Sequence, residues 1–322
     1  MTTPPFFQLY QHNAAAVAQE LLAGLSAPQA QTSPKYLYDA LGSRLFEAIT
    51  ELPEYDLARN EAQVLSEHAQ DMAAHLPAGA CWIDLGAGNC EKAARLLGRF
   101  AAARYVAVDI SVDFLREALE GLQRRFPALP SAGVGVDFSA GLVLPDELAL
   151  DAAMPRVLFY PGSSIGNFTP EQALGFLGSL HTACGTAAGS GLLIGVDLLK
   201  DAAELEAAYD DALGVTAAFD LNLLLHINRL VGSDFALGDW RHFSRFNAQQ
   251  SRVEMHLQAK RALTVRWPGG ERHFAAGQTI HTENACKWTV SGFEALLRTA
   301  GFTTTRVWTD AAQRFAVCWA SA

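Results

Sequence analysis

Two glycines in the stretch 81–92, CWIDLGAGNCEK, have the spacing of a turn that binds a ligand. The apolar run before Asp84 predicts a strand, and the residues from Glu91 onward have helical spacing. Glycine allows a tight turn and the close approach of a ligand because it has no Cβ. The helix that follows directs its free N–H groups at the same place. Gly86 and Gly88 therefore fit a nucleotide fold, a methyl-donor site or an ordinary turn between a strand and a helix.

Two acidic positions further along narrow the chemistry of this turn. Asp109 comes 23 residues after Gly86, where a carboxylate can accept hydrogen bonds from both hydroxyls of a ribose. This spacing suits NAD as well as S-adenosylmethionine. Glu91 stands where a dinucleotide site has its third glycine, and Asp137 with Phe138 offers a carboxylate and an aromatic face to an adenine. Both features favour the methyl donor, although each carboxylate taken singly also fits a helix cap or a turn.

The composition excludes several classes of partner. The 322 residues are 50% hydrophobic and carry a net charge of −10, without a cluster of lysines or arginines. We therefore expect neither nucleic acid nor an anionic membrane as a partner. No apolar segment approaches the roughly 18 residues of a membrane span, and the N-terminus has no signal pattern. The five cysteines lack metal-site spacing and are odd in number, which indicates a reducing compartment. We expect a cytoplasmic monomer without a metal.

Short apolar runs alternate with helical stretches in the first two thirds of the chain. Runs of this kind form a parallel sheet that is buried on both faces, with a ligand over the carboxyl ends of its strands. The sequence therefore predicts a Rossmann-like α/β fold. The five strands expected in it are 81–85, 104–108, 132–136, 155–160 and 192–196.

The alternation stops after residue 197 and resumes near residue 289, which predicts two domains. We expect one domain of residues 59–197 and 289–322, and a second lobe of residues 1–58 and 198–288, with the substrate site in the cleft between them. A single long helix is expected over 57–76. In the second lobe, residues 253–257 alternate like a strand, and Pro268-Gly269-Gly270 indicates a hairpin.

Six segments of the chain resemble the L-histidine N-alpha-methyltransferases of ergothioneine biosynthesis. This family is a branch of the Rossmann-like enzymes that use S-adenosylmethionine. The match extends over nearly the whole chain, and several of its strings are long. The segments are YLYDALGSRLFEAITELPEY (36–55), WIDLGAGNCEK (82–92), YPGSSIGNFTPE (160–171), GVDLLKD (195–201), AYDDALGVTAAFDLNLLLHINR (208–229) and IHTENACKW (280–288).

The resemblance implies a methyltransferase sheet joined to an α+β substrate-binding lobe, with S-adenosylmethionine as the cofactor and S-adenosylhomocysteine as its product. It implies that a small-molecule substrate, L-histidine, is methylated on its α-amine up to hercynine. The residues implied to hold the cofactor are Gly86, Gly88, Lys92, Asp109, Asp137 and Phe138. Those implied to surround the amino acid are Phe46, Tyr55, Asn167, Tyr209, Met255, Glu283, Asn284 and Ala285.

Three of the implied residues are expected to take part in methyl transfer: Tyr38, Asn167 and Tyr209. Tyr38 is expected near the transferred methyl group, as is Phe46. An asparagine can both donate and accept a hydrogen bond, while a tyrosine hydroxyl donates to a carboxylate. Glu283 can accept a charge-assisted bond from an imidazole N–H, which discriminates between amino-acid side chains.

One position departs from the pattern of the family, which usually reads Glu-x-Ser where this chain has Glu283-Asn284-Ala285. A hydroxyl that would meet the second imidazole nitrogen is therefore missing. Water, Asn284 or a backbone group can replace it, and equally the substrate can be another amino acid or an indole derivative. Outside this chemistry, the alternatives are a dinucleotide-binding oxidoreductase, which Glu91 disfavours, and a small-molecule binder without activity.

Overall fold

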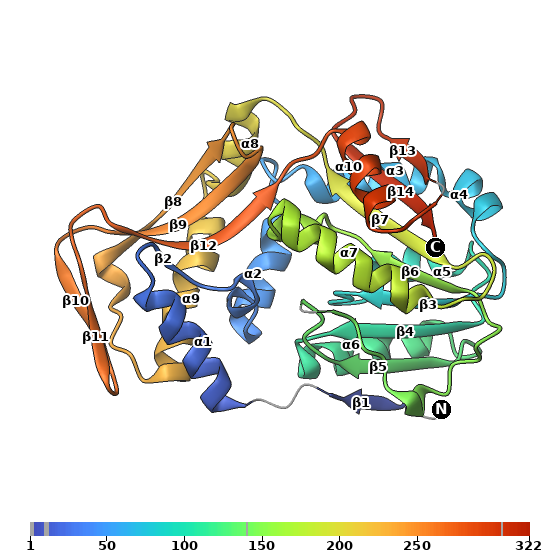
Figure 1. Cartoon of the computed structure of the whole chain (residues 1–322), viewed down its shortest axis with the longest axis horizontal. Coiled ribbons are helices and arrows are strands. Elements are labelled where there is room, and N and C mark those ends of the chain that lie inside the picture. The colour runs from blue at the N-terminus through green and yellow to red at the C-terminus, as the bar shows by residue number, and fades with distance from the viewer. Residues whose placement is uncertain (1–2, 10–12, 140, 304) are drawn as a thin grey trace. The chain divides into compact units, whose positions relative to one another are not determined.

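The chain forms two compact units. The computed structural model describes residues 3–9, 13–139, 141–303 and 305–322 (Figure 1). Unit 1 comprises strand β1 (Phe6–Gln8), Arg59–Leu199 and Trp288–Ala322, and unit 2 comprises residues 13–58 and Lys200–Lys287. None of the helices in the described part of the chain is long and apolar enough to cross a membrane.

Unit 1 is built on an eight-stranded mixed sheet, as the α/β prediction requires. The first six strands in its spatial order run parallel, and the last two form an antiparallel pair at one edge. The order reverses between β3 and β6, and such a switch point is where ligands bind in open sheets of this kind. The order is β1, β5 (Ser131–Gly135), β4 (Arg104–Asp109), β3 (Cys81–Leu85), β6 (Arg156–Tyr160), β7 (Gly191–Asp197), β14 (Phe315–Ser321) and β13 (Thr305–Thr309).

Helices cover both faces of this sheet (Figure 1). Helix α6 buries Leu115, Leu119 and Leu122 along one side, which is the spacing of an amphipathic helix. Helix α7 begins with a capping box in which Thr169 and Gln172 satisfy each other's backbone N–H groups. The helices of unit 1 are α3 (Leu57–Glu67), α4 (Ala69–His75), α5 (Glu91–Leu97), α6 (Val112–Arg125), α7 (Pro170–Cys184) and α10 (Val290–Thr299), with short turns η2 (Asp146–Leu148) and η3 (Ser164–Asn167).

Unit 2 packs helices against a four-stranded sheet. The sheet has the order β2 (Ala30–Gln31), β12 (Thr279–Cys286), β9 (Arg252–Ala259) and β8 (Trp240–Asn247). The hairpin of β10 (Leu263–Trp267) and β11 (Gly270–Phe274) confirms the turn predicted at Pro268-Gly269-Gly270. The helices are α1 (Ala14–Ser26), α2 (Ala40–Thr50), α8 (Ala202–Tyr209) and α9 (Val215–Val231), with turns η1 (Pro34–Leu37) and η4 (Leu237–Asp239).

Three boundaries differ from the sequence expectation. Strand β1 pairs in parallel with β5, so the start of the chain belongs to unit 1 rather than to the second lobe. Trp288 forms a bridge with Leu198, and both residues also belong to unit 1. The helix expected over 57–76 is interrupted at His68, whose ring lies 3.1 Å from the carbonyl oxygen of Thr309.

We predict that Gly42→Ala destabilises the protein by about 2 kcal/mol or more, because a Cβ at this position would overlap the carbonyl oxygen of Leu37. Gly98→Ala is the matched control, since a Cβ there meets nothing within 4 Å and the backbone φ of −70° suits alanine. Urea unfolding of both variants measures the difference. Equal stabilities would contradict the close approach of Gly42 to Leu37.

Candidate functional site

The glycine turn after β3 has the conformation that only glycine adopts easily. Gly86 and Gly88 have φ angles of +71° and +52°. The Gly86 N–H donates to the carbonyl oxygen of Val108 at 2.9 Å, which ties the turn to the end of β4. A Cβ on Gly86 would have no neighbour closer than the ring of Phe138, at 3.9 Å. The turn therefore leaves space beside its backbone for a ligand.

Asp109 lies at the end of β4 and holds this turn. Its Oδ2 accepts from the Gly88 N–H at 2.9 Å, and its Oδ1 accepts from the Ser111 N–H at 2.8 Å. Burial raises the pKa of Asp109, and these backbone N–H groups oppose the shift. A carboxylate oxygen has a second lone pair, so each oxygen can also accept from one ribose hydroxyl. The geometry fits the role expected for Asp109 in holding S-adenosylmethionine.

Asp137 and Phe138 follow β5 at the same end of the sheet. The Oδ1 of Asp137 accepts from the N–H of Ser139 at 3.0 Å and from its hydroxyl at 2.6 Å. The ring of Phe138 packs with those of Tyr160 and Phe176, at centroid distances of 6.1 Å in both cases. These contacts fix an aromatic ring next to the glycine turn, which suits the binding of an adenine.

Lys92 is positioned by a buried carboxylate that the sequence did not single out. Glu61, on α3, is 1% exposed and lies 2.7 Å from the ammonium group of Lys92. Its other oxygen accepts from the Gly162 N–H at 2.6 Å, and a Cβ on Gly162 would come within 2.9 Å of the Lys92 ammonium. Glu61 thus joins the turn after β6 to the helix that follows the glycine turn.

Asn167 belongs to unit 1, whereas the other residues implied to bind the amino acid belong to unit 2. It ends η3 at the carboxyl end of β6 and is half-buried. The preceding Ser163 has a φ of +56°, and its hydroxyl accepts from the N–H of Asp197 at 2.9 Å. This bond fixes the turn that carries Asn167 to the end of β7.

Five aromatic rings of unit 2 form one continuous cluster. Tyr38 packs edge-to-face against Phe46 and Phe219, with centroid distances of 5.5 Å each. Phe46 contacts Tyr55 at 6.4 Å, and Tyr55 contacts Tyr209 at 5.9 Å. The structure therefore brings together all four predicted aromatic residues and adds Phe219 from α9. Such a cluster offers ring faces to a cationic ligand.

Lys287 and His242 set the position of Tyr209. Lys287 is 4% exposed, and its ammonium donates to the Tyr209 hydroxyl at 2.9 Å. Because lysine has donors only, the phenol oxygen is the acceptor and the phenol retains its own proton as a donor. The Nε2 of His242 lies 2.7 Å from the carbonyl oxygen of Tyr209. Tyr209 is thus held through both its side chain and its backbone.

His242 also faces Asp220 of α9. Its Nδ1 lies 2.7 Å from a carboxyl oxygen of Asp220, so both ring nitrogens face oxygen atoms. Burial opposes the charge on the imidazole, but the hydrogen bond and charge of Asp220 and the Tyr209 carbonyl together raise the pKa of His242. The side chains of His242 and Asp220 are 1% and 0% exposed. The imidazole and the carboxyl group therefore form a buried pair.

Glu283 lies on what we call the inner face of the four-stranded sheet, the face that carries His242, Met255 and Ala285. A register shift between His281 and Glu283 makes a bulge, so these residues lie on opposite faces although they are two positions apart. Burial raises the pKa of Glu283 to about 8, Asp220 adds to the shift and Lys287 opposes it. Within the described chain, the Oε2 of Glu283 is buried without a hydrogen-bond partner.

Asn284 does not share this face. It pairs with Glu254 on the outer face, which also carries His281. Successive side chains of a strand alternate between faces, so Ala285 returns to the inner face opposite Val253. Asn284 is therefore not available to replace the hydroxyl that is missing at Ala285, contrary to the sequence expectation.

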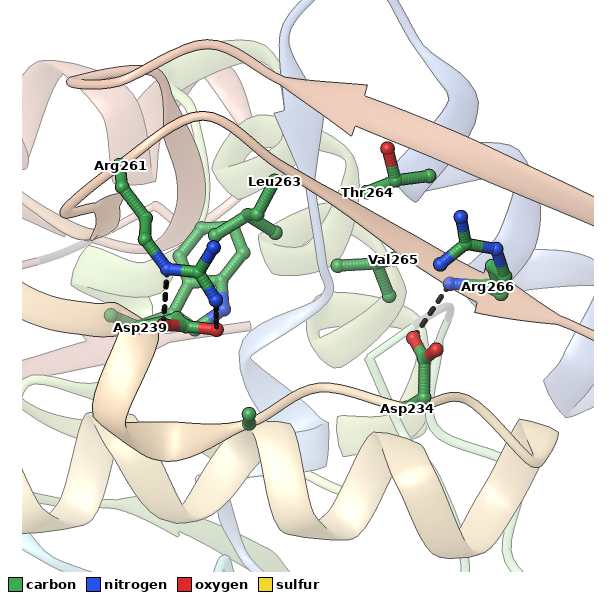
Figure 2. Close-up of a pocket in the computed structure, with 9 residues that line it drawn as sticks. Asp234, Asp239, Arg261, Leu263, Thr264, Val265 and Arg266 are labelled. Atoms are coloured by element: carbon green, nitrogen blue, oxygen red, sulfur yellow. Dashed lines mark hydrogen bonds and ion pairs between the residues drawn. The ribbon is translucent and has the colours of Figure 1, made fainter.

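A hollow of about 290 Å³ lies elsewhere in unit 2, at the base of the β10–β11 hairpin (Figure 2). Figure 2 shows Arg261 held by the carboxylate of Asp239 through two hydrogen bonds of 2.9 Å. Asp234 accepts from the backbone N–H of Arg266 at 2.7 Å. The charged side chains that line this hollow thus have partners within unit 2, including Glu271 for Arg266, and we assign it no ligand.

Comparison with known proteins shows the family to which the chain belongs. Residues 17–322 match the family described as histidine-specific methyltransferase, SAM-dependent. The chain belongs to this family. Histidine N-alpha-methyltransferase of Mycolicibacterium smegmatis is 37% identical over 308 residues, which cover 94% of each chain. The protein of that name from Mycobacterium tuberculosis is 35% identical over 306 residues, which cover 93% of each chain.

A third relative differs in length. Ergothioneine biosynthesis protein 1 of Neurospora crassa is 31% identical over 282 residues, which are 85% of this chain and 31% of the relative. The family match identifies the chain as a methyltransferase that uses S-adenosylmethionine, and not as a dinucleotide oxidoreductase. The structural features that fit this cofactor are the open glycine turn and the second lone pairs of Asp109.

Sequence reasoning missed several buried residues of the methyltransferase that surround the predicted ones. Glu61 stands in a helix with many charged residues, and His242 stands on a strand that was not predicted, so neither position gave a signal. Phe219, Asp220 and Lys287 do lie inside the segments that resemble the family. Their burial, at 4% exposure or less, was the missing information.

We predict that Asp109→Ala abolishes measurable binding of S-adenosylmethionine. Loss of two hydrogen bonds to a charged acceptor lowers the affinity by about 100-fold or more. Asp113→Ala removes an exposed carboxylate from the next helix and is the matched control. Titration calorimetry measures both affinities, and an unchanged affinity of Asp109→Ala would refute the role of Asp109.

We predict that Glu283→Gln changes the pH dependence of stability. The folded protein holds the Glu283 proton up to about pH 8, whereas the carboxyl has an ordinary pKa of 4.5. The stability that Glu283 contributes is full below pH 4.5 and is lost as the pH rises from 4.5 to about 8.

The free energy of unfolding of Glu283→Gln should therefore rise relative to that of the wild type across this range, by an amount on the order of a few kcal/mol. Urea unfolding of both proteins at pH 5 and pH 8 measures this difference. Parallel pH profiles would contradict the burial of an uncompensated carboxyl group.

Proposed function

We propose that this methyltransferase transfers methyl groups from S-adenosylmethionine to the α-amine of L-histidine, up to three times to give hercynine, in ergothioneine biosynthesis. The names of the relatives from M. smegmatis, M. tuberculosis and N. crassa support the proposal. The observation that carries it is the buried carboxyl oxygen of Glu283 in unit 2, which has no hydrogen-bond partner among the described residues. A buried acceptor favours a substrate whose side chain brings an N–H donor, and disfavours one that leaves it unpaired.

In this proposal the cofactor occupies the carboxyl ends of β3, β4 and β5. Asp109 accepts the ribose hydroxyls, and Asp137 with Phe138 binds the adenine. Gly86 and Gly88 allow the backbone to approach the ligand, and Lys92 is held in place by Glu61. When bound, S-adenosylmethionine supplies an electrophilic methyl group on a positively charged sulfur.

The amino acid is bound by polar groups at its two ends. Asn167 and Tyr209 hydrogen-bond to the α-amine and the carboxylate, and Tyr55 supports Tyr209 by ring contact. Glu283 accepts from the side-chain ring, with Met255 beside it on the inner face. The neutral amine attacks the methyl group in line with the bond that breaks, so alignment supplies most of the acceleration.

The aromatic cluster suits the products of successive transfers. Each methyl group leaves the nitrogen positively charged, and a trimethylated amine has no N–H to donate. The rings of Tyr38, Phe46 and Phe219 offer faces that attract such a cation by about 1 kcal/mol without a hydrogen bond. The same pocket can then hold the substrate and the methylated product.

A second candidate substrate is another amino acid or an indole derivative. The observation in its favour is Ala285, because this side chain gives the inner face no hydroxyl at a position beside Glu283. An indole has a single N–H and would satisfy Glu283 alone. The methyl-transfer chemistry is the same in both cases.

The proposal also places the enzyme in the cytoplasm, as a monomer without a metal. All five cysteines are buried, and their odd number is in keeping with a reducing compartment. Methyl transfer from a sulfonium to an amine changes no oxidation state that a metal would have to balance. Alignment of the two reactants is sufficient.

Incubation of the purified protein with S-adenosylmethionine and a panel of amino acids tests the proposal. We expect L-histidine to gain the mass of one, two and three methyl groups, while Asp109→Ala leaves it unmodified. Mass spectrometry identifies the products. If histidine stays unmodified while tryptophan or another amine gains methyl groups, the second candidate replaces the first.

A further inference from the structure

A row of three side chains crosses the inner face of the four-stranded sheet. Glu283 of β12 pairs with Met255 of β9, and Met255 pairs with Ser244 of β8. Paired residues of neighbouring strands project from the same face, so all three side chains lie on the inner face. His242, two residues before Ser244, confirms the direction of β8 because it contacts Asp220 of α9.

Both ends of this row carry buried oxygen atoms that lack a partner. Within the described part of the chain, neither the hydroxyl oxygen of Ser244 nor the Oε2 of Glu283 has a hydrogen bond. Buried polar groups are nearly always hydrogen-bonded, because a buried group without a partner destabilises the folded protein. The two oxygen atoms without partners, at opposite ends of one row, therefore indicate a polar molecule that lies between them.

The spacing of the row fits a small ring. Neighbouring strands lie about 4.8 Å apart, so the backbones of Glu283 and Ser244 are separated by roughly 10 Å. The two methylenes of Glu283 shorten this gap from one side. An imidazole with one hydrogen bond of roughly 2.9 Å at each end fills the remainder. The Met255 side chain, 2% exposed, provides an apolar surface under the ring.

Among the side chains of this row and its two flanking rows, Ser244 remains as the partner for the far side of the ring. One flanking row consists of Ala285, Val253 and Phe246, which carry no polar side-chain atom. The other consists of Ile280, Leu257 and His242. Both nitrogens of His242 are already engaged by Asp220 and by the Tyr209 carbonyl.

We propose that Ser244 is a specificity-determining residue whose hydroxyl binds the ring nitrogen of the substrate that faces away from Glu283. The inference rests on the proposed function, since it takes the imidazole of L-histidine as the ring. A hydroxyl both donates and accepts, so Ser244 matches this nitrogen with or without a proton. Together the two residues select a five-membered ring with nitrogen at both edges.

The test compares Ser244→Ala with Ser233→Ala. Ser233→Ala is the matched control because it removes the same hydroxyl group from the same unit. Ser233 follows the end of α9, and its hydroxyl donates to the side chain of Asn228. We expect Ser244→Ala to raise the KM for L-histidine about five- to tenfold, as loss of one neutral hydrogen bond implies. The affinity for S-adenosylmethionine, measured by calorimetry, should stay unchanged and confirms that the variant is folded.

Two histidine analogues, each methylated on a different ring nitrogen, give the sharper readout. The wild type should reject both, because one methyl group meets Glu283 and the other meets Ser244. Ser244→Ala should accept the isomer whose methyl group faces position 244 at least tenfold better than the wild type does, and should still reject the other.

Three outcomes overturn the inference or separate it from the proposed function. The role of Ser244 is refuted if Ser244→Ala has an unchanged KM for histidine, or if it accepts both methylated isomers equally well. In either case, methylation of histidine by the wild type would still support the proposed function. An equal effect of Ser233→Ala also refutes the role of Ser244. A wild type that methylates another amine and not histidine refutes both.

Discussion

In the proposed function, the substrate side of this methyltransferase depends on a carboxyl group kept out of water, that of Glu283. Burial favours its protonated form, and Asp220 strengthens that preference. Lys287 opposes that preference, and together with His242 it fixes Tyr209. In the proposed function, a buried carboxyl oxygen of this kind favours a ligand that donates a hydrogen bond to it, and specificity follows from the cost of leaving the oxygen unpaired.

The cofactor side relies on backbone geometry more than on buried charge. Backbone N–H groups from the glycine turn and the start of α6 orient Asp109. Glu61 joins α5, the helix that follows β3, to the turn after β6, and the order of the sheet reverses between these two strands. Contacts made by the fold itself thus set the shape of this site, in keeping with a cofactor whose charged and flat parts need fixed positions.

The bulge in β12 shows where sequence reasoning reached its limit. In a regular strand, His281 and Glu283 would share a face, and Asn284 would lie on the other with Thr282. The extra residue reverses this relation, so Glu283 turns toward α9 and Asn284 toward His281. The sequence 279–286 has no glycine or proline that would indicate a bulge. Strand β8 was not predicted because the positions that face inward include a histidine and a serine.

The sequence by itself determined the alternation of strands and helices in unit 1, the glycine turn, the acidic residues at the strand ends and the family. These features are local, since each depends on residues close together in the chain. Only the tertiary structure decided that the chain's start joins the first sheet, that Glu61 holds Lys92, and that His242, Ser244, Met255 and Glu283 share one face. Strand pairing and burial bring together residues that are far apart in the chain. The spacing of such residues in the sequence does not predict that they are in contact.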